Sequence, residues 1–320
     1  MVAFQRNKIN KLGSSGERKA LSTTFAGIHL SGSNATKTSV VVLDQFGDED
    51  NVSIKKVYEK IGSYGSLFSD ERLADILVGE GPFAEVFIDC PLSLPPCVSC
   101  GRQQCPGVIH CDDMGVAYMM ALSSKLKQKK VKRLRPINPQ NQRLWDVFQL
   151  FERTLGEEAE SLYSGPTFSA NMAPLVIRAK TLQRRLHALP VEIKLRETAI
   201  PYVLHDLRNY LKLPSDISLS YRNFEKGCSQ RQLVLGRLQA MGWINTKSFS
   251  APSNLKTNQD HFEMIISSVE NFHAFMAAWI GALYKLGFTI PKPDHFSEEE
   301  GWVHRPMFFC HIDKDDNKTH

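Results

Sequence analysis

The chain has 320 residues, of which 42% are hydrophobic and 23% are charged, and its formal net charge is +5. These proportions are ordinary for a globular protein, and they exclude collagen-like, coiled-coil and wholly disordered chains. A chain of this length can bury a sizeable core, either as one large domain with insertions or as two small domains. The mild positive charge alone does not favour any kind of partner.

Both ends of the chain are polar. Residues 1–22 are rich in Ser, Gly, Lys and Arg and contain one acid, so we expect a mobile basic leader, with a mitochondrial presequence as the alternative. Residues 311–320 are predicted to form a flexible tail.

The best apolar run, Phe272 to Leu286, contains His273 and Lys285 and is shorter than the roughly 18 residues that a membrane span needs. We therefore predict a cytoplasmic protein that does not associate with membranes.

Strand patterns dominate the first quarter of the chain. β-branched and apolar runs predict strands at residues 25–30, 38–43 and 52–61, joined by short turns into an antiparallel meander. The stretch from Ser69 to Val78 predicts a helix with Ser69 as its N-cap. Residues 85–90 predict a fourth strand, which ends at Pro91.

Helical patterns dominate the rest. One further strand is predicted at 191–198. The helices are predicted at residues 112–130, 139–160 and 171–188, after Pro201, and near 258–286. Three antiparallel strands, followed by a helix that crosses over to a fourth strand, are typical of a ribonuclease H-like arrangement. We therefore predict an α/β fold for residues 23–310: a ribonuclease H-like mixed sheet with flanking helices, a cysteine-rich insertion at 97–111 and a helical C-terminal region.

The cysteine-rich insertion carries the sharpest local signal. Cys97 and Cys100 form a Cys-x-x-Cys turn, and Cys105 and Cys111 follow within the same loop. Four soft ligands at this spacing predict a closed, tetrahedral, structural zinc site, in which His110 could replace Cys111. Unliganded, partly buried thiols and an iron–sulfur cluster are the alternatives.

Several short motifs, in this order, resemble a known family. They are Gly27-Ile-His29-Leu-Ser-Gly32 with Lys37-Thr38, Phe87-Ile-Asp89-Cys-Pro91-Leu-Ser-Leu-Pro95, Cys105-Pro-Gly, Pro139-Gln-Asn-Gln142-Arg143, Asn171-Met-Ala-Pro174 with Arg178-Ala, the strand ending at Glu197, His273-Ala-Phe-Met-Ala-Ala-Trp-Ile-Gly-Ala282 and Glu300-Gly-Trp302-Val-His-Arg-Pro306. The chain thus resembles, over about residues 25–306, a prokaryotic family of predicted nucleases with a ribonuclease H fold, the domain of unknown function number 429.

The resemblance implies a metal-dependent site. Ribonuclease H-type chemistry needs acidic metal ligands at the ends of the first and fourth strands and on a late helix. Asp89 matches, whereas His29 and His273 stand where the family usually has Asp. The implied catalytic residues are therefore Asp89, His29 and His273, with Glu197 or Glu270 as a further candidate. They would hold a divalent ion: Mg, Mn or Zn, or another borderline ion such as Fe.

Each of these residues also has a structural interpretation. His273 could be a packed, hydrogen-bonded core residue, and the same holds for His29. Asp89 could cap the turn before Pro91.

Cations near these motifs predict contacts with phosphate. Arg143 and Arg178 could bind phosphate oxygens in a bidentate manner, with Asn171 on the same helix face as Arg178; the alternative is a pair of surface salt bridges. The segment from Lys125 to Arg135 carries seven cations and no acid, among them Lys130 and Arg133. Nucleic acid is therefore the expected partner, although a solvated basic face would give the same pattern.

These observations together predict a metal-dependent, nuclease-like phosphodiester hydrolase with a structural zinc in the cysteine loop. The alternative is a catalytically inactive nucleic-acid-binding protein on the same fold, because two carboxylates are replaced by histidine. A kinase-like phosphate-binding fold ranks below both, since the strand meander has no second copy.

Overall fold

The structure is a computed structural model. It describes residues 22–32, 35–46, 51–63, 68–128, 137–155, 172–191, 193–245, 257–294, 296 and 301–307. The predicted leader, apart from Ser22, and the predicted tail lie outside these residues.

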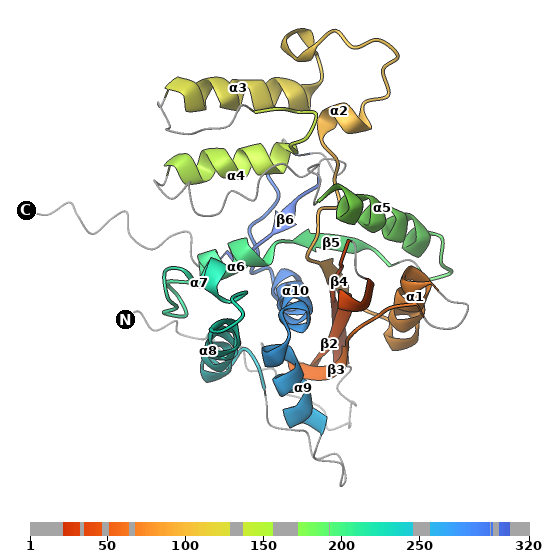
Figure 1. Cartoon of the computed structure of the whole chain (residues 1–320), viewed down its shortest axis with the longest axis vertical. Helices are drawn as coiled ribbons and strands as arrows, with labels where there is room; N and C mark the ends of the chain where they lie inside the picture. Colours follow the sequence, from red (N-terminus) through yellow and green to blue (C-terminus); the bar gives the residue numbers. More distant parts are fainter. Residues whose placement is uncertain are drawn as a thin grey trace, which may run out of the picture.

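A six-stranded mixed sheet forms the centre of the molecule (Figure 1), with the strand order β3-β2-β1-β4-β5-β6. Its strands are β1 (Ser22–His29), β2 (Ser39–Phe46), β3 (Ser53–Tyr58), β4 (Glu85–Ile88), β5 (Leu195–Thr198) and β6 (Val303–His304). The first three strands pair antiparallel, whereas β1, β4, β5 and β6 pair parallel. The predicted antiparallel meander and the predicted fourth strand are confirmed.

Helices cover both faces of the sheet. They are α1 (Ser69–Glu80), α2 (Pro96–Ser99), α3 (Met114–Gln128), α4 (Leu144–Leu155), α5 (Ala173–His187), α6 (Ile200–Leu207), α7 (Ile217–Ser220), α8 (Gly227–Ala240), α9 (Thr257–Ser267) and α10 (Val269–Lys285), with short 3-10 turns η1 (Ala35–Lys37) and η2 (Val108–His110).

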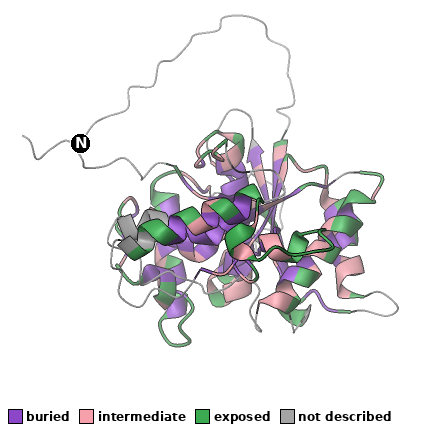
Figure 2. Cartoon of the chain, turned by 90° about the horizontal axis from the view of Figure 1, so that it is seen from above, coloured by how far each residue is buried: buried purple, intermediate pink, exposed green. Residues whose placement is uncertain are grey.

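The two faces of the sheet pack against different helices. Phe25 and Phe87 point toward α10, which is itself covered by α6, α7 and α8, while Ala26 and Ile28 point toward α1 and α5. Because both faces are covered, these strands are nearly continuous apolar runs. Figure 2 shows the buried residues gathered on the strands and on the helix sides that face them.

Helices α3 and α4 form a separate layer at one end of the molecule, at the top of Figure 1. They pack against each other, and in α4 Trp145 packs on Tyr202 while Phe148 packs on Phe296 and Trp302. The Cys97 N–H donates to the Pro139 carbonyl at 3.1 Å, which ties the start of the cysteine-rich region to the segment before α4.

Two local predictions were wrong, and one strand was missed. The N-cap of α1 is Phe68 rather than Ser69, and Glu71 accepts a hydrogen bond from the Phe68 N–H at 3.0 Å. The helix predicted near 258–286 is two helices, because the Ser268 hydroxyl accepts from the Asn271 N–H at 3.1 Å and so caps a new helix start. Strand β6 was not predicted, since two residues that pair only with β5 leave no periodic pattern.

Within the described residues, no helix has the length and apolar character that a membrane span requires.

Candidate metal centre

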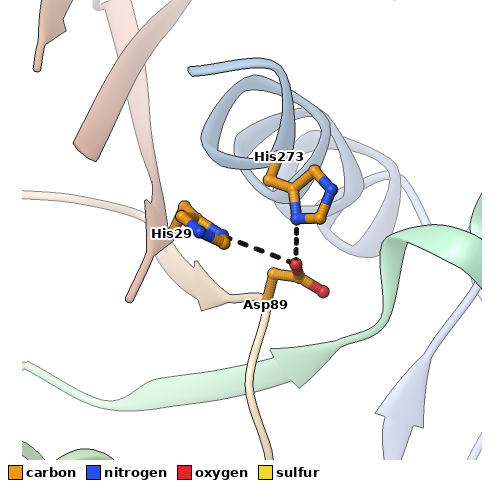
Figure 3. Close-up of side chains that lie close together, drawn as sticks. All are labelled: His29, Asp89 and His273. Atoms are coloured by element: carbon orange, nitrogen blue, oxygen red, sulfur yellow. Dashed lines mark hydrogen bonds and ion pairs between the residues drawn. The ribbon is translucent and has the colours of Figure 1, made fainter. Parts of the chain in front are cut away.

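Three distant parts of the sequence meet at one edge of the sheet. His29 is the last residue of β1 and Asp89 directly follows β4. Because these neighbouring strands are parallel, both residues lie at the same edge, and the Asp89 N–H donates to the Ile28 carbonyl at 3.0 Å. His273 lies in the first turns of α10, which crosses this edge (Figure 3). We call His29, Asp89 and His273 the His–Asp–His trio.

The side chains of the trio converge on one carboxylate oxygen. Asp89 Oδ2 is hydrogen-bonded to His273 Nδ1 and lies 3.7 Å from His29 Nδ1. One ligand atom from each of the three side chains lies within 4.8 Å of the others. Asp89 Oδ1 accepts from the Ile200 N–H at 3.1 Å, which fixes the carboxylate plane. The predicted association of these three residues is therefore present in the fold.

Burial and charge determine the protonation of the trio. Burial by itself would raise the pKa of Asp89, but the charge and hydrogen bond of His273, together with His29, hold that pKa well below its usual range. Burial lowers the pKa of His273 to about 4, against the attraction of Asp89. At neutral pH, Asp89 is therefore ionised, and a neutral His273 carries its proton on Nδ1, which donates to Asp89.

The other nitrogen of His273 also has a partner. The distance from His273 Nε2 to the Tyr221 hydroxyl is 2.8 Å, and Arg222 Nε donates to that hydroxyl at 2.7 Å. With the proton on Nδ1, the Tyr221 O–H donates to Nε2. Sequence reasoning missed Tyr221 and Arg222, because no motif surrounds them and only the fold brings α7 beside α10.

His29 is the member of the trio with an unsatisfied atom. Its Nδ1 is buried without a hydrogen-bond partner, although it lies near the Asp89 carboxylate. A buried, unsatisfied polar nitrogen is costly, and coordination to a cation is one way to satisfy it. Two imidazole nitrogens and one carboxylate oxygen suit a borderline ion such as Zn, Mn or Fe. The trio therefore fits a divalent ion, with His273 shifting its ring proton to Nε2.

Glu197 and Arg143 meet each other rather than the trio. Arg143 Nη1 lies 2.7 Å from Glu197 Oε1, and Arg143 Nη2 lies 3.1 Å from Asp146 Oδ1. Both side chains are about 4% exposed. Glu197 Oε2 also accepts from the Leu92 N–H at 2.8 Å. This buried ion pair ties β5 to the start of α4, and it leaves neither group facing solvent as a catalytic or substrate-binding residue would.

Arg178 is similarly engaged. Its Nε donates to Asp70 at 2.9 Å, and its Nη1 donates to the Ser31 carbonyl and to Thr38 Oγ1. These bonds clamp α5 and α1 to the turn after β1. The other substrate-binding residues predicted from the sequence, Asn171, Lys130 and Arg133, lie outside the described residues.

The cysteines of the loop form no disulfide and are close enough to influence one another. Burial raises the pKa of the Cys97 thiol, and Cys111, Cys105 and Cys100 raise it further. Among the described residues, the His–Asp–His trio is the group of three ligand side chains that converges within 4.8 Å, and the thiols do not converge to that degree. The zinc site stays a prediction.

In comparisons with models of protein families, with curated proteins and with solved structures, nothing matches this chain.

Proposed function

We propose that this protein is a metal-dependent, nuclease-like phosphodiester hydrolase with a ribonuclease H-like core, related to the predicted-nuclease family that its motifs resemble. The topology supports the fold: an antiparallel β1–β2–β3 meander with β4 parallel to β1 is the order that such a core requires. On this proposal the protein acts in the cytoplasm on nucleic acid. The fold suggests the activity by analogy, so the argument for function rests on the site.

The single observation that carries the proposal is the convergence of the His–Asp–His trio. Its members come from the ends of the first and fourth strands and from a late helix, which are the positions where ribonuclease H-type chemistry places metal ligands. The unsatisfied Nδ1 of His29 points to an additional partner at this place. His261 and His304 also have a buried Nδ1 without a hydrogen-bond partner, but of the three histidines only His29 has a carboxylate and a second imidazole beside it.

Each residue of the trio has a defined task in the proposed reaction. Asp89 supplies the anionic ligand, since it remains ionised far below neutral pH. The imidazoles of His29 and His273 supply neutral nitrogen ligands. A divalent ion held there would lower the pKa of a bound water and stabilise the leaving oxygen of the phosphodiester. Tyr221 orients His273 by holding the nitrogen that faces away from Asp89.

A catalytically inactive nucleic-acid-binding protein is the second candidate. One observation favours it: protein groups, Tyr221 and Asp89, already occupy both ring nitrogens of His273. In that case the trio would be a structural network that closes the end of the sheet, and the basic segment Lys125–Arg135 of the sequence would serve for binding alone.

Metal binding and hydrolysis distinguish the two candidates. Protein stripped with a chelator would be titrated with Mn²⁺ and Zn²⁺ by calorimetry and then tested on labelled DNA and RNA. The variants are Asp89→Asn, and Asp75→Asn as a matched control on the exposed side of α1. We expect wild type and Asp75→Asn to bind Mn²⁺ and cleave, and Asp89→Asn to lose both, while the zinc predicted for the cysteine loop binds to all three proteins. If Asp89→Asn bound Mn²⁺ as well as wild type does, the hydrolase proposal would be refuted.

A further inference from the structure

The cations that the motifs suggested for phosphate binding are already used by the fold. Arg143 is committed to Glu197 and Asp146, and Arg178 to Asp70 and two oxygens after β1. A phosphodiester at the His–Asp–His trio therefore needs a different cation. Such a cation must bring its charge close to the trio and must keep its guanidinium or ammonium group exposed.

Arg222 meets both conditions. Its Nε donates to the Tyr221 hydroxyl at 2.7 Å, and that hydroxyl lies 2.8 Å from His273 Nε2. Its positive charge contributes to lowering the pKa of His273. The residue is exposed, and among the described residues it pairs with no carboxylate. The single bond from Nε fixes the guanidinium while the two terminal nitrogens stay available for a bidentate contact with phosphate.

Phe224 lies two residues further on and is fully exposed, with a relative exposure of 101%. It belongs to the turn Tyr221–Lys226 between α7 and α8, which holds the cations Arg222 and Lys226 and the single acid Glu225. An exposed aromatic ring beside cations is the arrangement on which unpaired bases stack while their phosphates are neutralised. A base inside a duplex cannot present its face in this way.

The turn is held in place by bonds to its backbone. Arg231 Nη1 donates to the Tyr221 carbonyl at 2.7 Å, and Asn223 Oδ1 accepts from the Glu225 N–H at 2.9 Å. Gly227 allows this close packing, because a Cβ there would lie 2.6 Å from the Tyr221 oxygen. The ordered turn therefore holds Phe224 in its exposed position, so the ring is preorganised for contact with a ligand.

We propose that the turn Tyr221–Lys226 is a contact surface for single-stranded nucleic acid: Arg222 binds a backbone phosphate beside the His–Asp–His trio, and the Phe224 ring stacks on an unpaired base. This inference rests on the proposed function and narrows its substrate to single strands. Arg222 would also link substrate binding to the trio, since the same side chain holds Tyr221.

Binding of labelled oligonucleotides tests this surface. Fluorescence anisotropy with a 20-residue oligo-dT, an oligo-U of equal length and a duplex would be measured for wild type, Phe224→Ala and Arg222→Gln. The matched controls are Met241→Ala and Arg237→Gln, which make similar changes at the opposite end of α8. We expect each test variant to weaken single-strand binding about tenfold, and the controls to match wild type. Arg222→Gln should also reduce the slope of log K against log salt by about 0.7.

The proposal is overturned if Phe224→Ala binds single strands as tightly as wild type, if wild type prefers the duplex, or if it binds no nucleic acid. It is equally overturned if Phe224 mediates a dimer, which light scattering would reveal as an assembly lost in Phe224→Ala. Calorimetry with Mn²⁺ on the same proteins reports on the metal centre separately. Phe224→Ala should bind the ion like wild type, so the loss of this surface and the loss of the metal centre are distinguishable.

Discussion

Among single side chains, Asp89 carries the most information about function. It is a buried carboxylate whose charge is maintained by two imidazoles and a backbone N–H. Such a group is expensive to bury unless it is paired, and here the partners are imidazoles, a side-chain type that is also suited to metal coordination. Arg143 and Glu197 show the contrasting case, because their mutual ion pair satisfies both charges and serves the fold.

His273 makes the stability of the metal-free protein depend on pH. Its pKa is about 4 in the folded chain, whereas an unfolded imidazole titrates near ~6.5. Between these values the unfolded chain binds a proton that the folded chain does not. The free energy of unfolding should therefore fall as the pH falls through this window, by up to ~1.4 kcal/mol per pH unit. Asp89 acts in the same direction only in stronger acid, because its own folded pKa is depressed.

Urea unfolding of the chelator-treated protein between pH 4.5 and 7.5 measures this dependence. The comparison is with His273→Gln, which keeps a polar group but does not titrate. We expect a smaller change of the unfolding free energy with pH in the variant than in wild type. Equal pH dependence in both proteins would show that His273 is not the titrating group.

Among the secondary-structure elements, α10 determines where the site lies. It packs directly on the backbone of β1, because Gly27 has no side chain: a Cβ there would lie 2.0 Å from the Ala274 carbonyl oxygen and 2.2 Å from the Ala278 nitrogen. This close approach brings His273 to the end of β1 and β4. The N-cap at Ser268 is equally important, because it sets the point at which α10 begins, close to the trio.

Two glycine-to-alanine changes test this packing. Gly27→Ala should destabilise the protein by ~3 kcal/mol or more, because neither backbone can yield to the added methyl group. Gly236→Ala, in the middle of α8 with nothing within 4 Å of the added carbon, should stabilise it by about 0.8–1 kcal/mol. Thermal and urea unfolding measure both. A Gly27→Ala variant as stable as wild type would contradict the close packing of α10 on β1.

For the whole molecule, the arrangement of layers separates the His–Asp–His trio from the cysteine loop. The trio lies at the edge of the central sheet, whereas α3 and α4 form their own layer with the loop beside them. The loop 97–111 contains no large buried side chain. A segment without a core of its own needs another source of stability, and a zinc ion held by Cys97, Cys100, Cys105 and Cys111 would supply it.

Elemental analysis of the purified protein tests the zinc. We expect one zinc per chain, which is lost on Cys97→Ser and retained on Cys228→Ser, an exposed cysteine outside the loop. Retention of the metal in Cys97→Ser, or its loss only in Asp89→Asn, would place the zinc at the trio instead.

Local signals in the sequence were sufficient to predict the strand meander, the fourth strand and most of the helices. Alternation, β-branched runs and proline act over a few residues, so they can be recognised without knowing the fold. Asp89 and the two histidines could be selected because they lie in motifs beside those elements.

Contacts between distant residues could not be inferred in this way. Arg143 and Arg178 look alike in the sequence as phosphate ligands, and only the packing of α4 and α5 shows that each is held by a carboxylate. Tyr221, Arg222 and Phe224 have no sequence signature at all. Their positions follow from the placing of α7 and α8 beside α10, which depends on the packing of apolar faces far apart along the chain.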